Sequence, residues 1–288
     1  MADTILVTGA TGTVGSEVIR QLRDRGIPVR AGVHTPEKAG IFSEQGIDVV
    51  HIDYEKADTF DTAVAGVDKL FFVGFAGPQF TGVSRQLART AKQAGVTHFV
   101  KLSAYGAGFA PEFYIANAHR ESEAAIEAEG IAYTHLRPNV FMQNLINYHG
   151  WSIRQEGKFY LAQGNGKVSF IDVRDVGTAA VTVLTQPGHE GKAYTLTGLE
   201  ALTYHQAAVI LSEAVGKPIT YVPLSEAEAR QRAQAMGQPD FLIDIGVNMD
   251  TFGRADGFAR ITQEFEELAH QEPITFKQFA RDYTDAFA

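Results

Sequence analysis

The sequence contains no cysteine, which excludes disulfide bonds, thiolate metal ligands and a cysteine nucleophile. It has 25 Lys and Arg residues against 34 Asp and Glu residues, so its net charge is −9. No cluster of basic residues offsets this acidity, and we therefore expect no nucleic-acid partner. The lack of cysteine fits a reducing compartment, and a cytoplasmic location is expected.

Signals for membranes, secretion and metals are also missing. No apolar run approaches the roughly 18 residues that a membrane-spanning helix needs, so no membrane association is expected. The first residues lead into an apolar strand pattern without a basic region, so we expect no signal peptide. The 9 histidines are scattered and form no His-xxx-His pair or His–carboxylate set. We therefore expect no metal.

Short apolar runs alternate with longer amphipathic segments, which predicts strand–helix–strand units on a parallel sheet. In four places a glycine stands between a helical pattern and the next strand, as is typical of a helix C-cap: Gly26, Gly46, Gly95 and Gly130. The expected strands are residues 4–7, 29–33, 48–52, 69–73, 97–102, 133–136 and 193–197. The expected helices are residues 14–25, 36–45, 57–64, 83–94 and 112–129. This pattern predicts an α/β fold with a doubly wound Rossmann sheet.

After residue 137 the regular alternation loosens, and prolines separate shorter elements. We predict an NAD(P)-binding Rossmann domain over residues 1–137. Residues 138–288 are expected to form a smaller α+β substrate-binding lobe, with strands that return to the main sheet. A helix is expected from Val173 to Leu184, with Asp172 and Asp175 as capping residues. Residues 240–257 show no clear helix or strand pattern.

A glycine-rich turn follows the first expected strand and precedes the first expected helix. Its glycines stand at positions i, i+3 and i+6, where they permit a tight turn, close approach of a phosphate and close helix–strand packing. The N-terminus of the helix adds N–H groups and a partial positive charge. Turns also collect glycine for structural reasons, but the flanking strand and helix favour a dinucleotide pyrophosphate. The expected contacts are Gly9, Thr11, Gly12, Thr13, Val14 and Gly15.

The end of the second expected strand carries no acidic residue to bind the ribose hydroxyls of NAD(H). His34 and Lys38 follow instead, which favours the 2′-phosphate and hence NADP(H) over NAD(H). The alternative is that both are solvated surface groups. Asp53 is a candidate acceptor for the adenine amino group or a loop-capping acid. Gly74 either lets the backbone approach the cofactor or only ends a strand.

Several motifs together resemble the extended and atypical short-chain dehydrogenases/reductases. They are Thr8–Gly15, Lys101–Ala104, Tyr133–Asn139 and Phe170–Val176. Phe141–Leu145 is similar to the NmrA-like branch, which includes NADPH quinone reductases, triphenylmethane reductases, imine reductases and cofactor-binding regulators. The resemblance runs from residue 3 to about residue 225 and implies a Rossmann fold that binds NAD(P)(H).

Most short-chain dehydrogenases use a serine with a tyrosine and a lysine four residues apart on one helix. Counting back from Gly130 puts Ile115 at the place of the tyrosine and His119 at that of the lysine, so this pair is predicted to be absent. The chemistry that remains is hydride transfer to a conjugated electrophile, which can take its proton from water. The resemblance implies that His119 contacts the nicotinamide ribose, lines the pocket or acts as a general acid. It can also be a surface histidine.

Other candidate residues follow the fifth and sixth expected strands. Ser103 lies where the family has its serine and can bond to a substrate oxygen or cap the next turn. Tyr105 is a candidate proton donor. An aromatic wall with a few amides suits a flat apolar acceptor, although much of it can be ordinary core. Its members are Asn139, Phe141, Met142, Asn144, Tyr148 and Trp151.

These features predict an NADPH-dependent reductase, a monomer or homodimer, whose small-molecule acceptor is a quinone, an imine, a dye or an enone. The alternative hypothesis is a catalytically silent regulator that senses NADP(H) and binds a protein partner. A sugar-nucleotide epimerase is a third option, but the missing tyrosine counts against it.

Overall fold

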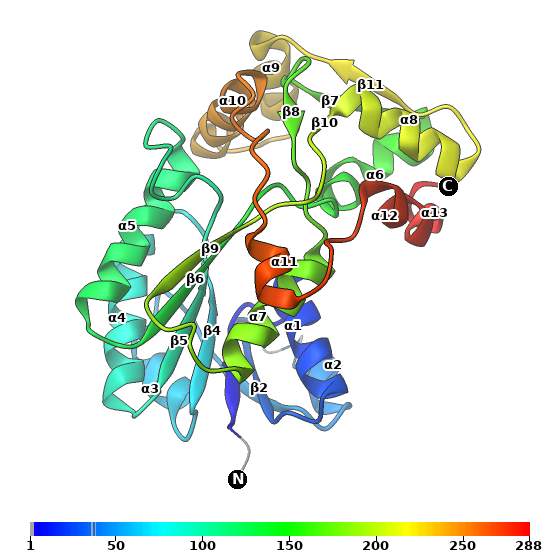
Figure 1. Cartoon of the computed structure of the whole chain (residues 1–288). Helices are drawn as coiled ribbons and strands as arrows, with labels where there is room; N and C mark the ends of the chain where they lie inside the picture. The colour runs from blue at the N-terminus through cyan, green and yellow to red at the C-terminus, as the bar shows by residue number, and fades with distance from the viewer. Residues whose placement is uncertain (1–2, 36, 38) are drawn as a thin grey trace. The chain divides into compact units, whose positions relative to one another are not determined.

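Seven strands form one sheet in the computed structural model, in the order β3-β2-β1-β4-β5-β6-β9 (Figure 1). The structure describes residues 3–35, 37 and 39–288. All pairings from β3 to β6 are parallel, which confirms the predicted doubly wound sheet. The strands are β1 (Ile5–Val7), β2 (Val29–Val33), β3 (Asp48–His51), β4 (Lys69–Val73), β5 (His98–Leu102), β6 (Tyr133–Pro138) and β9 (Lys192–Leu196).

The strand order reverses at β1. β1 pairs with β2 on one side and with β4 on the other, so the chain crosses β1 when it passes from β3 to β4. In open parallel sheets, ligands bind beyond the carboxyl ends of the strands at such a switch point. A ligand site is therefore expected at the residues that follow β1 and β4.

Helices cover both faces of this sheet. On one face, α1 (Thr13–Asp24) packs against α7 (Val173–Thr185), and α2 (Gly40–Ser43) lies on the same side (Figure 1). The other face carries α3 (Asp58–Val64), α4 (Phe80–Gln93) and α5 (Tyr114–Ala128). Their apolar side chains share a buried cluster with the strands, which includes Phe60, Leu70, Phe72, Leu87, Phe99 and Ile126. No helix in the described part of the chain has the length and apolarity that crossing a membrane requires.

Most of the predicted elements are present, with shifted ends. The predicted glycine C-caps are confirmed, because Gly26, Gly46, Gly95 and Gly130 have φ angles between +64° and +89°. The helix expected over residues 36–45 is shorter in the described residues, where only α2 is an α-helix. Part of the ambiguous segment after residue 239 forms a regular helix, α10 (Asp240–Arg254).

The chain divides into two compact units. The first is Met1–Phe109, Ala116–Arg137 and Val173–Tyr194, and the second is Ala110–Ile115, Pro138–Asp172 and Thr195–Ala288. The second unit has a parallel pair, β7 (Lys158–Leu161) with β11 (Thr220–Pro223), and an antiparallel pair, β8 (Lys167–Val168) with β10 (Leu202–Thr203). Its helices besides α10 are α6 (Asn144–Glu156), α8 (Tyr204–Val215), α9 (Glu226–Ala235), α11 (Glu264–Ala269), α12 (Phe276–Asp282) and α13 (Thr284–Phe287).

Candidate active site

The turn between β1 and α1 leaves little room for a side chain at its three glycine positions. Gly9 has φ +60°, a left-handed conformation, and a Cβ there would lie 3.0 Å from Val73 Cβ. A Cβ on Gly12 would lie 3.2 Å from Gly9 O, and one on Gly15 would lie 2.8 Å from Gly9 C. The backbone therefore folds back on itself more closely than a side chain allows.

This turn ends in the N-terminus of α1. Gly12 is the N-cap residue and has no side chain to satisfy the first N–H groups of the helix. Thr11, Gly12 and Thr13 are exposed, whereas Val14 and Gly15 are buried and anchor the helix start. An exposed helix N-terminus behind a glycine turn fits a dinucleotide pyrophosphate, because N–H groups and the helix dipole both favour an anion.

A buried hydrogen-bond network holds the ends of β1 and β4 together beside the turn. Thr8 Oγ1 accepts a hydrogen bond of 2.9 Å from the N–H of Val73. Tyr54 Oη lies 2.6 Å from Val73 O and 2.9 Å from Thr8 Oγ1. Burial raises the pKa of Tyr54, so its hydroxyl keeps the proton that it donates here. The network fixes the strand ends from which Gly9 and Gly74 follow.

The predicted 2′-phosphate and adenine residues lie at the ends of β2 and β3. Asp53 is buried, and its carboxylate accepts the Glu55 N–H at 3.0 Å and pairs with Lys56 Nζ at 3.1 Å. His34 is exposed, with Nε2 3.6 Å from Asp53 Oδ1. Backbone hydrogen bonding from Glu55 and the charge of Lys56 lower the pKa of Asp53. Lys38, the other predicted phosphate ligand, lies outside the described residues.

Gly74 has a packing role that the sequence did not indicate. A Cβ at this position would overlap Phe80 and lie 2.7 Å from Phe72 Cζ. Glycine therefore lets these two rings pack under the end of β4. Next to them, a hollow of about 320 Å³ is lined mainly by Tyr54, Phe75, Pro78, Phe80 and Val83. This hollow follows β3 and β4, on the ligand-binding edge of the sheet.

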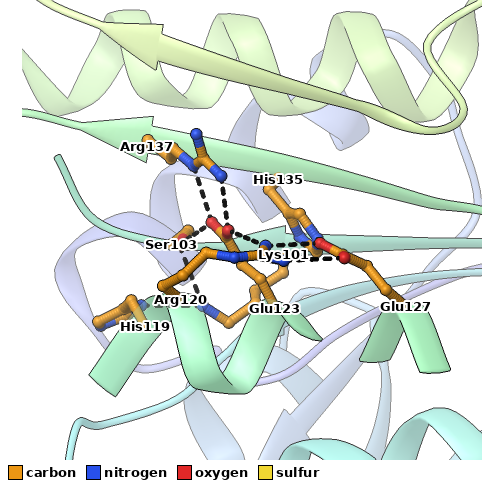
Figure 2. Close-up of polar contacts among 8 residues, drawn as sticks. All are labelled: Lys101, Ser103, His119, Arg120, Glu123, Glu127, His135 and Arg137. Atoms are coloured by element: carbon orange, nitrogen blue, oxygen red, sulfur yellow. Dashed lines mark hydrogen bonds and ion pairs between the residues drawn. The ribbon is translucent and has the colours of Figure 1, made fainter. Parts of the chain in front are cut away.

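A buried polar cluster lies between β5, β6 and α5, and it contains two of the predicted catalytic residues (Figure 2). Ser103 follows β5 and donates its hydroxyl to Glu123 Oε1 at 2.6 Å. It also accepts a hydrogen bond of 3.2 Å from Lys101 Nζ. Both bonds direct the hydroxyl into the cluster. Neither of them caps the turn after β5, which was the alternative role for Ser103.

Glu123 is the anionic centre of this cluster. Besides Ser103, it accepts hydrogen bonds from Arg137 at 2.9 and 2.6 Å and from Arg120 at 2.8 Å. Burial by itself would raise the pKa of Glu123, but the hydrogen bond and charge of Arg137 outweigh it and lower the pKa to about 2. The carboxylate is therefore ionised at neutral pH.

Lys101 is buried near the carboxyl end of β5 and lies against His119 on α5. Its Nζ is 2.9 Å from His119 Nδ1 and 5.2 Å from the centre of the Phe80 ring. Burial lowers the pKa of Lys101 to about 7, and it lowers the pKa of His119 well below the ordinary value. His119 is thus a buried neutral imidazole beside a lysine, and the surface alternative for it is wrong.

Sequence reasoning assigned no role to Lys101, Glu123 or Arg137. One signal was available for Lys101, because it interrupts the apolar run of β5 although all five residues of that strand are buried. A signal for Glu123 was its position four residues after His119, which puts both on one face of α5. Neither signal identifies which residues these side chains contact, because the contacts join residues of β5, α5 and β6.

The far end of the cluster is an ion-pair network. Arg120 pairs with Glu127 at 2.6 Å and His135 Nε2 lies 3.2 Å from Glu127 Oε1. Glu123, Glu127 and His135 have ligand atoms close enough for a metal ion. Guanidinium groups already occupy both carboxylates, however, so these residues form a paired network and do not need a cation.

The remaining predicted residues differ in burial. Tyr105 is buried and packs edge-on against Phe109, with 5.2 Å between ring centres. In the second unit, Asn139 is buried, and its amide bonds to Ser169 Oγ, Phe258 O and Val140 N. The other members of the predicted wall are a buried Met142, half-buried Phe141 and Asn144, and exposed Tyr148 and Trp151.

Comparisons with known proteins cover almost the whole chain. The model of the NmrA-like family matches residues 1–280. NAD(P)H azoreductase of Xenophilus azovorans is 36% identical over 283 residues, 98% of this chain and 99% of that protein. The NADPH-dependent quinone oxidoreductase of Escherichia coli, solved with NADPH, has a TM-score of 0.85 and 31% identity over 96% of this chain and 99% of that chain. Triphenylmethane reductase of Citrobacter sp., solved with NADP(H), has a TM-score of 0.84 and 28% identity over 97% of this chain and 99% of that chain.

Proposed function

Because the chain belongs to the NmrA-like family, we propose that it is an NADPH-dependent reductase of small conjugated electrophiles: quinones, imines, dyes or enones. The observation that carries the proposal is the glycine turn before α1, which would fit a pyrophosphate and leaves little space for side chains. Reductases that match nearly the full length support this function over that of a silent NADP(H)-sensing regulator.

The first unit would hold the cofactor. Backbone N–H groups from Gly9 to Gly15 would bind the pyrophosphate. His34, with Lys38, would bind the 2′-phosphate, and Asp53 would accept the adenine amino group. The bound nicotinamide would supply the hydride. Gly74 contributes through the Phe72 and Phe80 packing that shapes the adjoining hollow.

The protein residues would supply positioning and a proton. By position in the sequence, Ile115 and His119 would stand where most short-chain dehydrogenases have tyrosine and lysine, so a tyrosine at that place would not supply the proton. Ser103 gives its own proton to Glu123, which leaves only its oxygen lone pairs for other contacts. His119 would contact the ribose or the acceptor. Tyr105 and the wall residues, Asn139, Phe141, Met142, Asn144, Tyr148 and Trp151, remain candidates for acceptor binding.

The partners follow from charge and composition. A net charge of −9 opposes nucleic-acid binding, and the lack of cysteine fits a cytoplasmic enzyme. We expect it to act as a monomer or homodimer on a small molecule.

The proposal predicts turnover with conjugated acceptors. Purified protein should oxidise NADPH in the presence of at least one class among quinones, azo dyes, cationic triphenylmethane dyes, imines and enones. A saturated alcohol with NADP⁺ should give no reaction, because no tyrosine–lysine pair is available to take its proton. Measurement of NADPH absorbance across this panel checks both expectations. Tight NADPH binding with no consumption by any acceptor would favour the regulator instead.

Cofactor choice gives a second prediction. His34→Ala should raise KM for NADPH roughly tenfold and leave KM for NADH unchanged, because one charge-assisted contact to phosphate contributes about 1.4 kcal/mol. His51→Ala is the matched control, since His51 is an exposed histidine whose ring lies 6.4 Å from that of His34. If His34→Ala raised KM equally for NADPH and NADH, His34 would not be the residue that binds the 2′-phosphate.

A further inference from the structure

The contacts of Lys101 define the direction of its hydrogen bonds. Glu123 is a carboxylate and can only accept, so the Ser103 hydroxyl must donate to it. Ser103 Oγ then accepts from Lys101 Nζ at 3.2 Å. The other groups around Nζ are His119 Nδ1 at 2.9 Å and the Phe80 ring face. An ammonium group has three N–H donors and no lone pair, and these neighbours offer one acceptor for each of them.

This direction determines the tautomer of His119. If the Lys101 ammonium donates to Nδ1, the ring proton must lie on Nε2. Within the described residues, Nε2 has no hydrogen-bond partner, and it is not among the fully buried unpartnered atoms. His119 as a whole is 7% exposed. The Nε2 edge is therefore the part of the ring from which a proton can leave the cluster (Figure 2).

We propose that Lys101 is a positioning residue that holds His119 with its proton on Nε2 and gives a proton to Nδ1 when His119 donates its Nε2 proton to the reduced acceptor. This inference rests on the proposed reductase function and adds the source of the proton. It concerns acceptors whose reduction needs a proton, such as neutral quinones and azo compounds.

The step balances in protons and electrons. After hydride transfer, a lone pair on the acceptor oxygen or nitrogen takes the Nε2 proton, and the Nε2–H bond breaks. The Nδ1 lone pair takes a proton from Lys101, so a Nδ1–H bond forms and a Nζ–H bond breaks. The two side chains end as a neutral amine and a Nδ1-protonated imidazole. A proton from solvent then binds the accessible Nε2, and the Nδ1 proton returns to Nζ, so the ammonium and the Nε2-protonated imidazole are both restored. The residues themselves are neither oxidised nor reduced.

The charges around Lys101 suit this role. Burial has the largest effect on the pKa of Lys101 and lowers it. The charge of Glu123 raises this pKa, and the charges of Arg137 on β6 and Arg120 on α5 lower it. The resulting pKa of Lys101 is about 7. His119 stays neutral beside it, and burial keeps His135 on β6 largely neutral by lowering its pKa to about 4. Lys101 thus gains and loses its proton in the neutral range, whereas the guanidinium groups cannot.

The test compares two acceptors in Lys101→Met. A neutral quinone needs a proton after the hydride, whereas a cationic triphenylmethane dye becomes neutral with the hydride alone. With the quinone, kcat should fall roughly 100-fold, as expected for losing general acid catalysis, while kcat with the cationic dye is retained. The wild-type kcat for the quinone should also decline above about pH 7, where the ammonium is lost, and the variant should lack this decline. Lys92→Met, at an exposed lysine of α4, is the control and should match wild type.

A readout without turnover comes from ¹⁵N NMR of the histidine rings in the cofactor-free wild type. The His119 signal, assigned by its loss in His119→Gln, should show a protonated Nε2 and an unprotonated Nδ1 below pH 7. A protonated Nδ1 would overturn the proposal, and so would equal loss of turnover with both acceptors in Lys101→Met. If no acceptor reacts even with wild type, the reductase function fails, and ¹⁵N NMR of wild type and Lys101→Met still decides whether Lys101 holds the ring proton of His119 on Nε2.

Discussion

Gly15→Ala should abolish cofactor binding at ordinary NADPH concentrations and destabilise the first unit. The new Cβ would overlap the backbone of Gly9, and backbone cannot move aside as the tip of a side chain can. Helix α1 cannot easily move away from Gly9, because it packs closely against α7. A Cβ on Gly177 of α7 would lie 2.8 Å from Gln21 Nε2 of α1. We expect at least a roughly 100-fold rise in Kd, equivalent to about 2.7 kcal/mol, with a stability loss of about 1–3 kcal/mol from overpacking.

Calorimetric titration with NADPH and urea unfolding would measure both effects. Gly82→Ala is the control, because Gly82 lies in the exposed part of α4 with open space where a Cβ would be. This substitution should leave Kd unchanged and stabilise the helix by up to about 1 kcal/mol. NADPH affinity of Gly15→Ala equal to that of wild type would show that the turn does not hold the pyrophosphate.

Glu123→Gln should be the most destabilising single change in the polar cluster. It removes the buried charge that Arg137 and Arg120 share, which leaves Arg137 without its carboxylate partner and Arg120 with Glu127 alone. Breaking a buried ion pair in this way costs about 3–5 kcal/mol. Chemical unfolding at pH 7 measures the difference. Glu129→Gln, which breaks the more exposed pair with Arg89, is the control and should shift the unfolding midpoint little.

The same residue predicts how stability depends on pH. The pKa of Glu123 is about 2 in the folded protein against 4.5 for an ordinary glutamate, so ionisation favours the folded state. This contribution, on the order of 3 kcal/mol, is complete above about pH 4.5 and is lost as the pH falls towards 2. The stability difference between wild type and Glu123→Gln should therefore shrink between pH 5 and pH 3. A constant difference across this range would contradict the ionised, paired state of Glu123.

Local patterns in the chain were sufficient for the sheet and the cofactor turn. Apolar alternation between strands and helices, with glycine where each helix ends, depends on neighbours close in sequence. The turn from Gly9 to Gly15 belongs largely to the same class, because a Cβ on Gly12 or Gly15 would meet the backbone of Gly9, although the limit at Gly9 also involves Val73 on β4. Burial of the side chains after β6 was harder to predict: Met142 and Tyr148 were assigned to one wall, but the first is buried and the second is 76% exposed.

The sequence by itself thus determined the order of strands and helices, the place of the glycine turn and the candidacy of Ser103 and His119. Only the tertiary structure showed that Lys101, Glu123 and Arg137 meet around them, since these side chains come from β5, α5 and β6 (Figure 2). The physical reason is that backbone conformation follows local sterics and periodicity. The protonation state of a buried group depends instead on charges and donors that arrive from distant segments when the chain folds.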